Sequence, residues 1–110
     1  MGAQDHLQIE VAQQDDRVVL SLNGELDMAS APLLEQAVED AETDTAQTVV
    51  LDLHHLEFID STGLRIILSA RRQCHERGQE LAVTRGSQQV ERLLSVTGMS
   101  AHLRTVEASG

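Results

Sequence analysis

Residues 48–68 read TVVLDLHHLEFIDSTGLRIIL, and this stretch decides the fold class. Its first part, 48–53, is a nearly continuous apolar run, which is typical of a strand buried on both faces of a parallel sheet. Leu64 and Ile67 recur at helical spacing near its end, so an amphipathic helix is expected there. Residues 54–60 between the two are expected to form a loop. The stretch therefore predicts a strand–loop–helix unit.

A hairpin and a helix are expected on its N-terminal side. Apolar and polar residues alternate over 7–12 and again over 18–22, the period of strands with one buried face, so the two segments predict an antiparallel pair. A helix follows, roughly Ala31 to Glu42, with Ser30 as its N-cap and Pro32 in its first turn. Strand, helix and strand in this order predict a right-handed parallel crossover.

The C-terminal side continues the alternation of strands and helices. Residues 81–83 are expected to form a core strand, Ser87 to cap a helix that Gly98 ends, and 102–106 to form an edge strand. The predicted fold class is α/β, with an N-terminal hairpin followed by βαβ-type units. Helices pack on a mixed sheet of about four to five strands.

Length and composition limit the function. The chain has 110 residues, so 1–110 is expected to be a single domain with a core of about 7–106. Its formal net charge is −10, with no lysine, which argues against nucleic acid and anionic membranes as partners. One cysteine, Cys74, excludes a disulfide framework and a thiolate metal cluster. Neither a long apolar run nor a signal-like segment at 1–8 is present, which predicts a cytoplasmic protein.

Asp60-Ser61-Thr62-Gly63 is the candidate functional site. It follows a parallel strand on its carboxyl side, where sites in open α/β sheets usually form. Asp60 or Ser61 would cap the helix, and Gly63 would allow a close backbone approach. A phosphate on Ser61 would meet free backbone N–H groups and the positive end of the helix dipole, worth about 0.3–1 kcal/mol. These four residues alone favour an ordinary helix cap over a regulatory site.

A second tetrapeptide, Gly24-Glu25-Leu26-Asp27, follows the second expected strand. With both tetrapeptides in this order, the chain from Leu7 to about Val106 resembles the STAS domain, above all the single-domain anti-sigma factor antagonists of bacteria. The resemblance implies that Ser61, the first hydroxyl residue of its motif, is phosphorylated with ATP by an anti-sigma factor that is also a serine kinase. It also implies that Asp27 is the family's acidic residue beside the phosphorylation site.

What the resemblance implies is partner switching. The unphosphorylated protein would bind the anti-sigma factor and free a sigma factor, phosphorylation would end binding, and a PP2C-type phosphatase would restore it. We expect a monomer that is not an enzyme and that uses neither a cofactor nor a metal. The residues expected to contact the partner flank the phosphoacceptor in both tetrapeptides and just beyond: Gly24, Glu25, Asp27, Asp60, Thr62, Gly63, Leu64 and Arg65. Thr62 replaces a serine common in the family, and Arg65 stands where many relatives carry a small residue.

Other functions remain open. Within the same fold, the chain could regulate a transporter or a stressosome-like scaffold without a sigma factor. A response-regulator receiver could use Asp52 as its acceptor, but it also needs a lysine, which is absent. The aspartic-protease triplet is interrupted by Thr62. A hydrolase could use Ser61 with His54, His55 and Asp52, but closeness in sequence does not show convergence in space.

The remaining candidates for chemistry point to structural roles. His54 and His55 are adjacent on an extended segment, so their side chains point in opposite directions and do not predict a metal site. Cys74 and Phe58 are expected in the core. The other histidines are expected at the surface: His6, His75 and His102.

Overall fold

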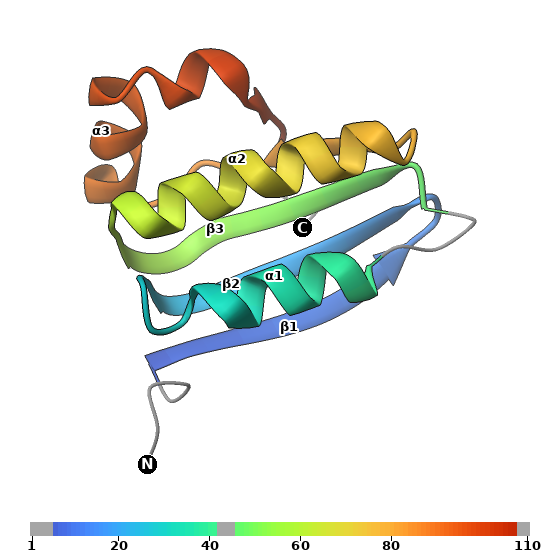
Figure 1. Cartoon of the computed structure of the whole chain (residues 1–110), viewed down its shortest axis with the longest axis horizontal. Helices are drawn as coiled ribbons and strands as arrows, with labels where there is room; N and C mark the ends of the chain where they lie inside the picture. The colour runs from blue at the N-terminus through green and yellow to red at the C-terminus, as the bar shows by residue number, and fades with distance from the viewer. Residues whose placement is uncertain (1–5, 42–45, 108–110) are drawn as a thin grey trace.

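A mixed five-stranded sheet in the order β1-β2-β3-β4-β5 forms the centre of the computed structural model, which describes residues 6–41 and 46–107 (Figure 1). The strands and helices are β1 Leu7–Gln14, β2 Arg17–Leu26, α1 Ala31–Asp40, β3 Thr48–Ile59, α2 Ser61–Glu76, β4 Glu80–Val83, α3 Gln88–Val96, the 3-10 helix η2 Met99–His102 and β5 Arg104–Thr105. β1 pairs with β2 in the antiparallel sense and all other pairs are parallel. The α/β fold class, the hairpin and the mixed sheet are thereby confirmed.

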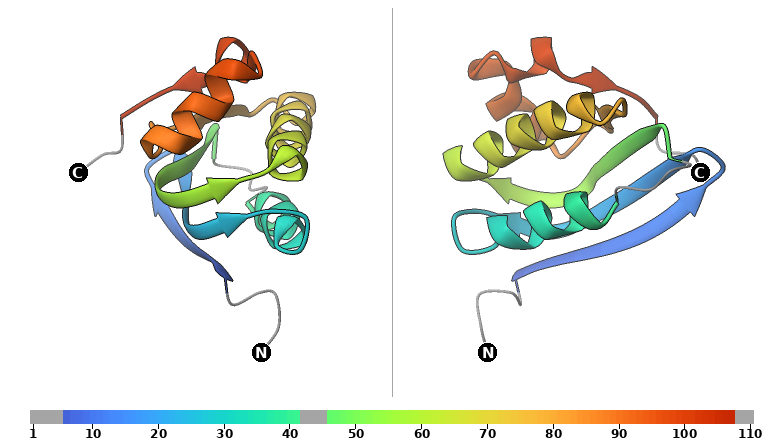
Figure 2. Two further views of the ribbon diagram at one scale, coloured as in Figure 1. Left: turned by 90° about the vertical axis from the view of Figure 1, so that its left-hand side faces the viewer. Right: turned by 45° about the vertical axis from the view of Figure 1, so that its right-hand side comes forward.

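Helices α1 and α2 lie side by side along one face of the sheet, as the views in Figures 1 and 2 show. Leu20 of β2, Leu51 of β3, Leu34 of α1 and Ile67 of α2 are fully buried between these two layers. Cys74 is buried on α2 as expected, and this burial raises the pKa of its thiol. The aliphatic core therefore lies between the central strands and the two helices.

The expected loop over residues 54–60 is wrong, because β3 continues to Ile59. Its second half pairs with the end of β2, from Asn23 opposite His55 to Leu26 opposite Ile59. Two register shifts, opposite Ser21–Asn23 and Gly24–Glu25, each place one extra residue in β3 and break its regular alternation of buried and exposed residues. The irregular spacing hides the strand in the sequence, although main-chain pairing with β2 stabilises it.

Two apolar residues are more exposed than expected. Phe58 is 39% exposed, because the irregular register of β3 turns Leu56 and Ile59 inward and leaves Phe58 beside α3. Val11 is 63% exposed, although its partner Leu20 is fully buried. β1 is an edge strand with one neighbouring strand, so the helices do not cover the half of it that contains Val11.

Several expected boundaries also shift. β2 does not end at Gly24 but runs on to Leu26, and Gly24 adopts φ 117° within it. α1 ends at Asp40, and Glu42 lies outside the described residues. The last strand covers only Arg104–Thr105, because the residues before it form η2.

None of the described helices is both long and apolar enough to span a bilayer.

Candidate phosphoacceptor and partner-binding site

Asp60 joins the start of α2 to the loop that precedes α1. Its Oδ1 accepts a hydrogen bond from the backbone N–H of Gly63 at 2.9 Å, so Asp60, rather than Ser61, is the N-cap of α2. Its Oδ2 accepts from the N–H of Met28 at 3.3 Å, and its own N–H donates to the carbonyl of Leu26 at 3.2 Å. One side chain therefore fixes both segments of the candidate site.

Ser61 is the first residue of α2, and it is exposed. Within the described part of the chain, its hydroxyl forms no hydrogen bond. The first backbone N–H groups of a helix have no partner inside the helix, and the dipole there favours negative charge. Since Asp60 already caps the helix, a group added to the Ser61 hydroxyl would break no hydrogen bond of the fold.

Gly63 is required by close packing against the sheet. A Cβ at this position would lie 2.8 Å from Ile59 Cγ1 and 2.8 Å from the carbonyl oxygen of Leu26. This agrees with the close approach expected from the sequence. Gly63 and Leu64 are buried in the free chain, so they position the first turn of α2 rather than expose surface to a partner.

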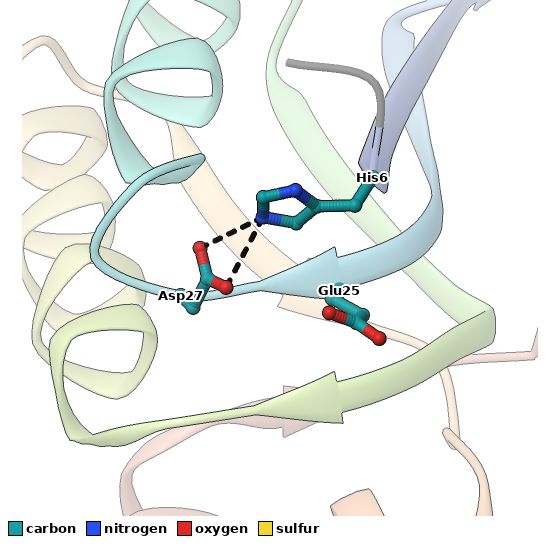
Figure 3. Close-up of side chains that lie close together, drawn as sticks. All are labelled: His6, Glu25 and Asp27. Atoms are coloured by element: carbon teal, nitrogen blue, oxygen red, sulfur yellow. Dashed lines mark hydrogen bonds and ion pairs between the residues drawn. The ribbon is translucent and has the colours of Figure 1, made fainter. Parts of the chain in front are cut away.

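The loop after β2 is held together by the carboxylate of Asp27. Its Oδ1 accepts from the N–H groups of Ala29 and Ser30, both at 3.0 Å, and Nε2 of His6 lies 3.1 Å from each carboxylate oxygen (Figure 3). The hydrogen bond from His6 is the main cause that lowers the pKa of Asp27, and hydrogen bonds from Ser30 add to it. Asp27 is therefore a structural acceptor as well as a local negative charge.

Ser30 does not cap α1 through its side chain, contrary to expectation. Its buried hydroxyl donates to the carbonyl of Glu25 at 2.8 Å and accepts from the N–H of Asp27 at 3.0 Å. Serine is favoured both at helix caps and in tight turns. In this structure the Ser30 hydroxyl bonds to the backbone of the turn and does not cap the helix.

Both tetrapeptides lie at the same end of the sheet (Figure 1), because β2 and β3 are parallel and their carboxyl ends meet. The expected phosphoacceptor Ser61 is exposed at this end, as are the expected partner contacts Glu25 and Arg65, and Thr62 is partly exposed. Met28, a residue not expected at the site, is 74% exposed in the same loop. The sequence offers one signal for it, a long apolar side chain in the segment between an expected strand and an expected helix.

The candidate hydrolase residues do not assemble around Ser61. Asp52 Oδ1 lies 2.9 Å from Nδ1 of His54 and accepts from the hydroxyl of Thr84 at 3.0 Å. Burial alone would raise the pKa of Asp52, but hydrogen bonds from His54 and Thr84 outweigh it and lower the pKa. In the described structure, the hydroxyl next to the Asp–His pair is that of Thr84, which is buried and already bonded.

Asp60→Ala should lower the free energy of unfolding by about 1–2 kcal/mol, because loss of an N-cap typically costs about 1 kcal/mol and the tie to Met28 is lost too. Urea unfolding followed by circular dichroism measures this. Ser87→Ala is the matched control, since Ser87 caps α3 with a longer bond of 3.3 Å to Val90 and ties no second segment. An Asp60→Ala variant as stable as the parent would contradict the role of Asp60.

Comparison with known proteins agrees with this geometry. The profile of the STAS domain family matches residues 8–109. The anti-sigma-F factor antagonist RsfB of Mycobacterium tuberculosis is 33% identical over 87 residues, which cover 79% of this chain and 71% of RsfB. Among solved structures, an anti-sigma factor antagonist from Mycobacterium paratuberculosis superposes with a TM-score of 0.80 at 28% identity, covering 98% of this chain and 92% of that one. The phosphorylated form of the Bacillus protein SpoIIAA shares the fold, with a TM-score of 0.68 at 20% identity over 94% of this chain and 91% of that chain.

Proposed function

Since this chain belongs to the STAS domain family, we propose that it is an anti-sigma factor antagonist whose binding to its partner is switched by a phosphate on Ser61. The names of its relatives support the antagonist function, because RsfB, which is 33% identical, is an anti-sigma-F factor antagonist. The partner proposed here is an anti-sigma factor with serine kinase activity, met in the cytoplasm. Binding to it frees the sigma factor.

The exposed hydroxyl of Ser61, at the start of a helix that Asp60 already caps, is the observation that carries the switch. A kinase can reach this oxygen without unfolding α2. The phosphate then stays next to helix N–H groups, which tolerate negative charge. Phosphorylation therefore leaves the fold intact and changes the surface alone.

The charge around Ser61 explains why the phosphate would end binding. A phosphoserine adds about −1.5 to −2 charge at neutral pH, and Asp60 is its immediate neighbour. Asp27 and Glu25 add further carboxylates at the same end of the sheet, where Arg65 contributes a guanidinium. A partner surface that accommodates the free hydroxyl would meet this charge at close range, where mismatched charges cost several kcal/mol.

The unphosphorylated surface combines a small hydroxyl with an apolar contact. Met28 is exposed in the loop that hydrogen-bonds to Asp60, and Thr62 and Arg65 follow Ser61 along α2. Exposed methionine adapts to a partner pocket because its side chain is flexible and polarisable. A PP2C-type phosphatase would regenerate this surface by removing the phosphate.

Phosphate transfer tests the proposal. The purified protein is incubated with ATP and each anti-sigma factor kinase encoded in the same genome, and the phosphate is located by mass spectrometry. We expect phosphate on Ser61 and none on the Ser61→Ala variant, while Ser69→Ala, an exposed serine farther along α2, should be labelled like the parent. Labelling of Ser69 or Thr62 with Ser61 intact, or no labelling by any of these kinases, would contradict the proposed switch.

A further inference from the structure

Three metal-ligating side chains meet where β1 begins and β2 ends. His6, Glu25 and Asp27 each offer one ligand atom, and these atoms all lie within 4.8 Å of one another. Figure 3 shows the imidazole of His6 turned toward Asp27, with Glu25 on the neighbouring strand. Among the described residues, this is the only group in which three such atoms come together.

The register of the β1–β2 hairpin brings these three side chains together. Leu7 pairs with Gly24 in the antiparallel hairpin, so His6 is brought next to Glu25. Residues two apart on an extended segment project to the same side, which favours convergence of Glu25 and Asp27. The first and third ligands are far apart in sequence, so their convergence depends on the folded hairpin.

The spacing suits chelation. Nε2 of His6 lies 3.1 Å from each oxygen of Asp27. Zinc binds imidazole nitrogen and carboxylate oxygen at about 2.0–2.2 Å, so two tetrahedral ligands lie about 3.3 Å apart. A cation could therefore replace the proton that His6 and Asp27 now share, with little movement of either side chain.

The carboxylate of Asp27 is already oriented for this role. The N–H groups of Ala29 and Ser30 both donate to its Oδ1, whereas its Oδ2 accepts only from His6 in the described structure. Hydrogen bonds of this kind to a ligating carboxylate hold metal ligands in position. The side chain of Glu25 is exposed and makes no hydrogen bond among the described residues, so it is free to close on an ion.

The pair Asp52 and His54 shows what distinguishes the cluster. Their ligand atoms are also close, at 2.9 Å, but Oδ1 of Asp52 accepts from the ring and the N–H of His54 and from Thr84. No third metal-ligating group joins this pair in the described part of the chain. Proximity of one histidine and one carboxylate is therefore not sufficient.

We propose that His6, Glu25 and Asp27 form a binding site for a divalent transition-metal ion of the zinc type, with water completing its coordination. One imidazole with two carboxylates suits such ions, whereas magnesium and calcium prefer ligand sets made of oxygen alone. The site does not depend on phosphorylation of Ser61, so either proposal can fail without the other.

Calorimetric titration of the chelator-treated full chain with zinc chloride tests the site. We expect one zinc per chain, with magnesium chloride bound at least about tenfold more weakly. His6→Ala and Glu25→Gln should each lower the zinc affinity by about tenfold or more, in the range found when metal sites lose supporting groups. His102→Ala, an exposed histidine elsewhere, should bind zinc like the parent.

Heteronuclear NMR of the same samples separates this site from adventitious binding. Zinc should shift the amide resonances of His6, Glu25 and Asp27, and circular dichroism should show that both variants stay folded. Absence of zinc binding by the parent would overturn the proposal. So would binding that survives unchanged in folded His6→Ala and Glu25→Gln, or shifts centred on other residues.

Discussion

Ser61→Asp should lower the affinity of this protein for its anti-sigma factor by about a hundredfold or more. A like-charge clash at the centre of an interface costs several kcal/mol, and each 1.4 kcal/mol is about tenfold in affinity. The new carboxylate would stand beside Asp60 at the start of α2, in the position of the proposed phosphate. Isothermal titration calorimetry with the purified anti-sigma factor measures the change.

Two variants make this result specific. Ser61→Ala removes the phosphoacceptor without adding charge, so it should keep an affinity close to that of the parent. Arg72→Ala alters an exposed cation farther along α2, away from the candidate site, and should also change little. If Arg72→Ala weakened binding more than Ser61→Asp, the partner surface would be misplaced.

Gly24→Ala should destabilise the fold by about 3 kcal/mol or more, from strained backbone and overpacking together. Gly24 adopts φ 117°, which an alanine rarely tolerates, and its Cβ would lie 2.1 Å from the carbonyl oxygen of His6. That oxygen belongs to the backbone, so it cannot swing aside as a flexible side chain could. Urea unfolding measures the loss, and amide exchange should show β1 opening first at its N-terminal end.

Gly78→Ala is the control, because it introduces the backbone strain of a positive φ without a steric clash of the added Cβ. Gly78 has φ 77° after the end of α2, but a Cβ there would meet no atom within 4 Å. We expect it to cost about 1 kcal/mol from left-handed backbone alone. Equal losses for both variants would show that the contact with His6 does not limit the fold.

The elements that local patterns determine were predictable. The apolar run at the start of β3 and the helical spacing of α2 both reflect burial within one segment. The capping function of Asp60 also follows from local chemistry, because a carboxylate before a helix can accept its free N–H groups. The position of both tetrapeptides, 24–27 and 60–63, at one end of the sheet follows from the rule that the carboxyl ends of neighbouring parallel strands lie at the same edge.

The features that depend on register were not predictable. The second half of β3 forms because the end of β2 pairs with it despite two extra residues in β3, and the same register leaves Phe58 at the surface. His6 was expected to be an ordinary surface residue, but the hairpin brings it to Asp27. Ser30 has two favourable uses for its hydroxyl, and only the folded turn decides between them.

The most direct test of the switch compares two forms of the same protein. The kinase-phosphorylated and phosphatase-treated forms are titrated with the anti-sigma factor, and their backbone NMR spectra are compared. We predict that the phosphorylated form binds about a hundredfold more weakly or worse, that phosphatase restores binding, and that spectral changes stay near Ser61. Equal affinity of the two forms, or a backbone rearranged throughout the domain, would contradict a switch made by surface charge at Ser61.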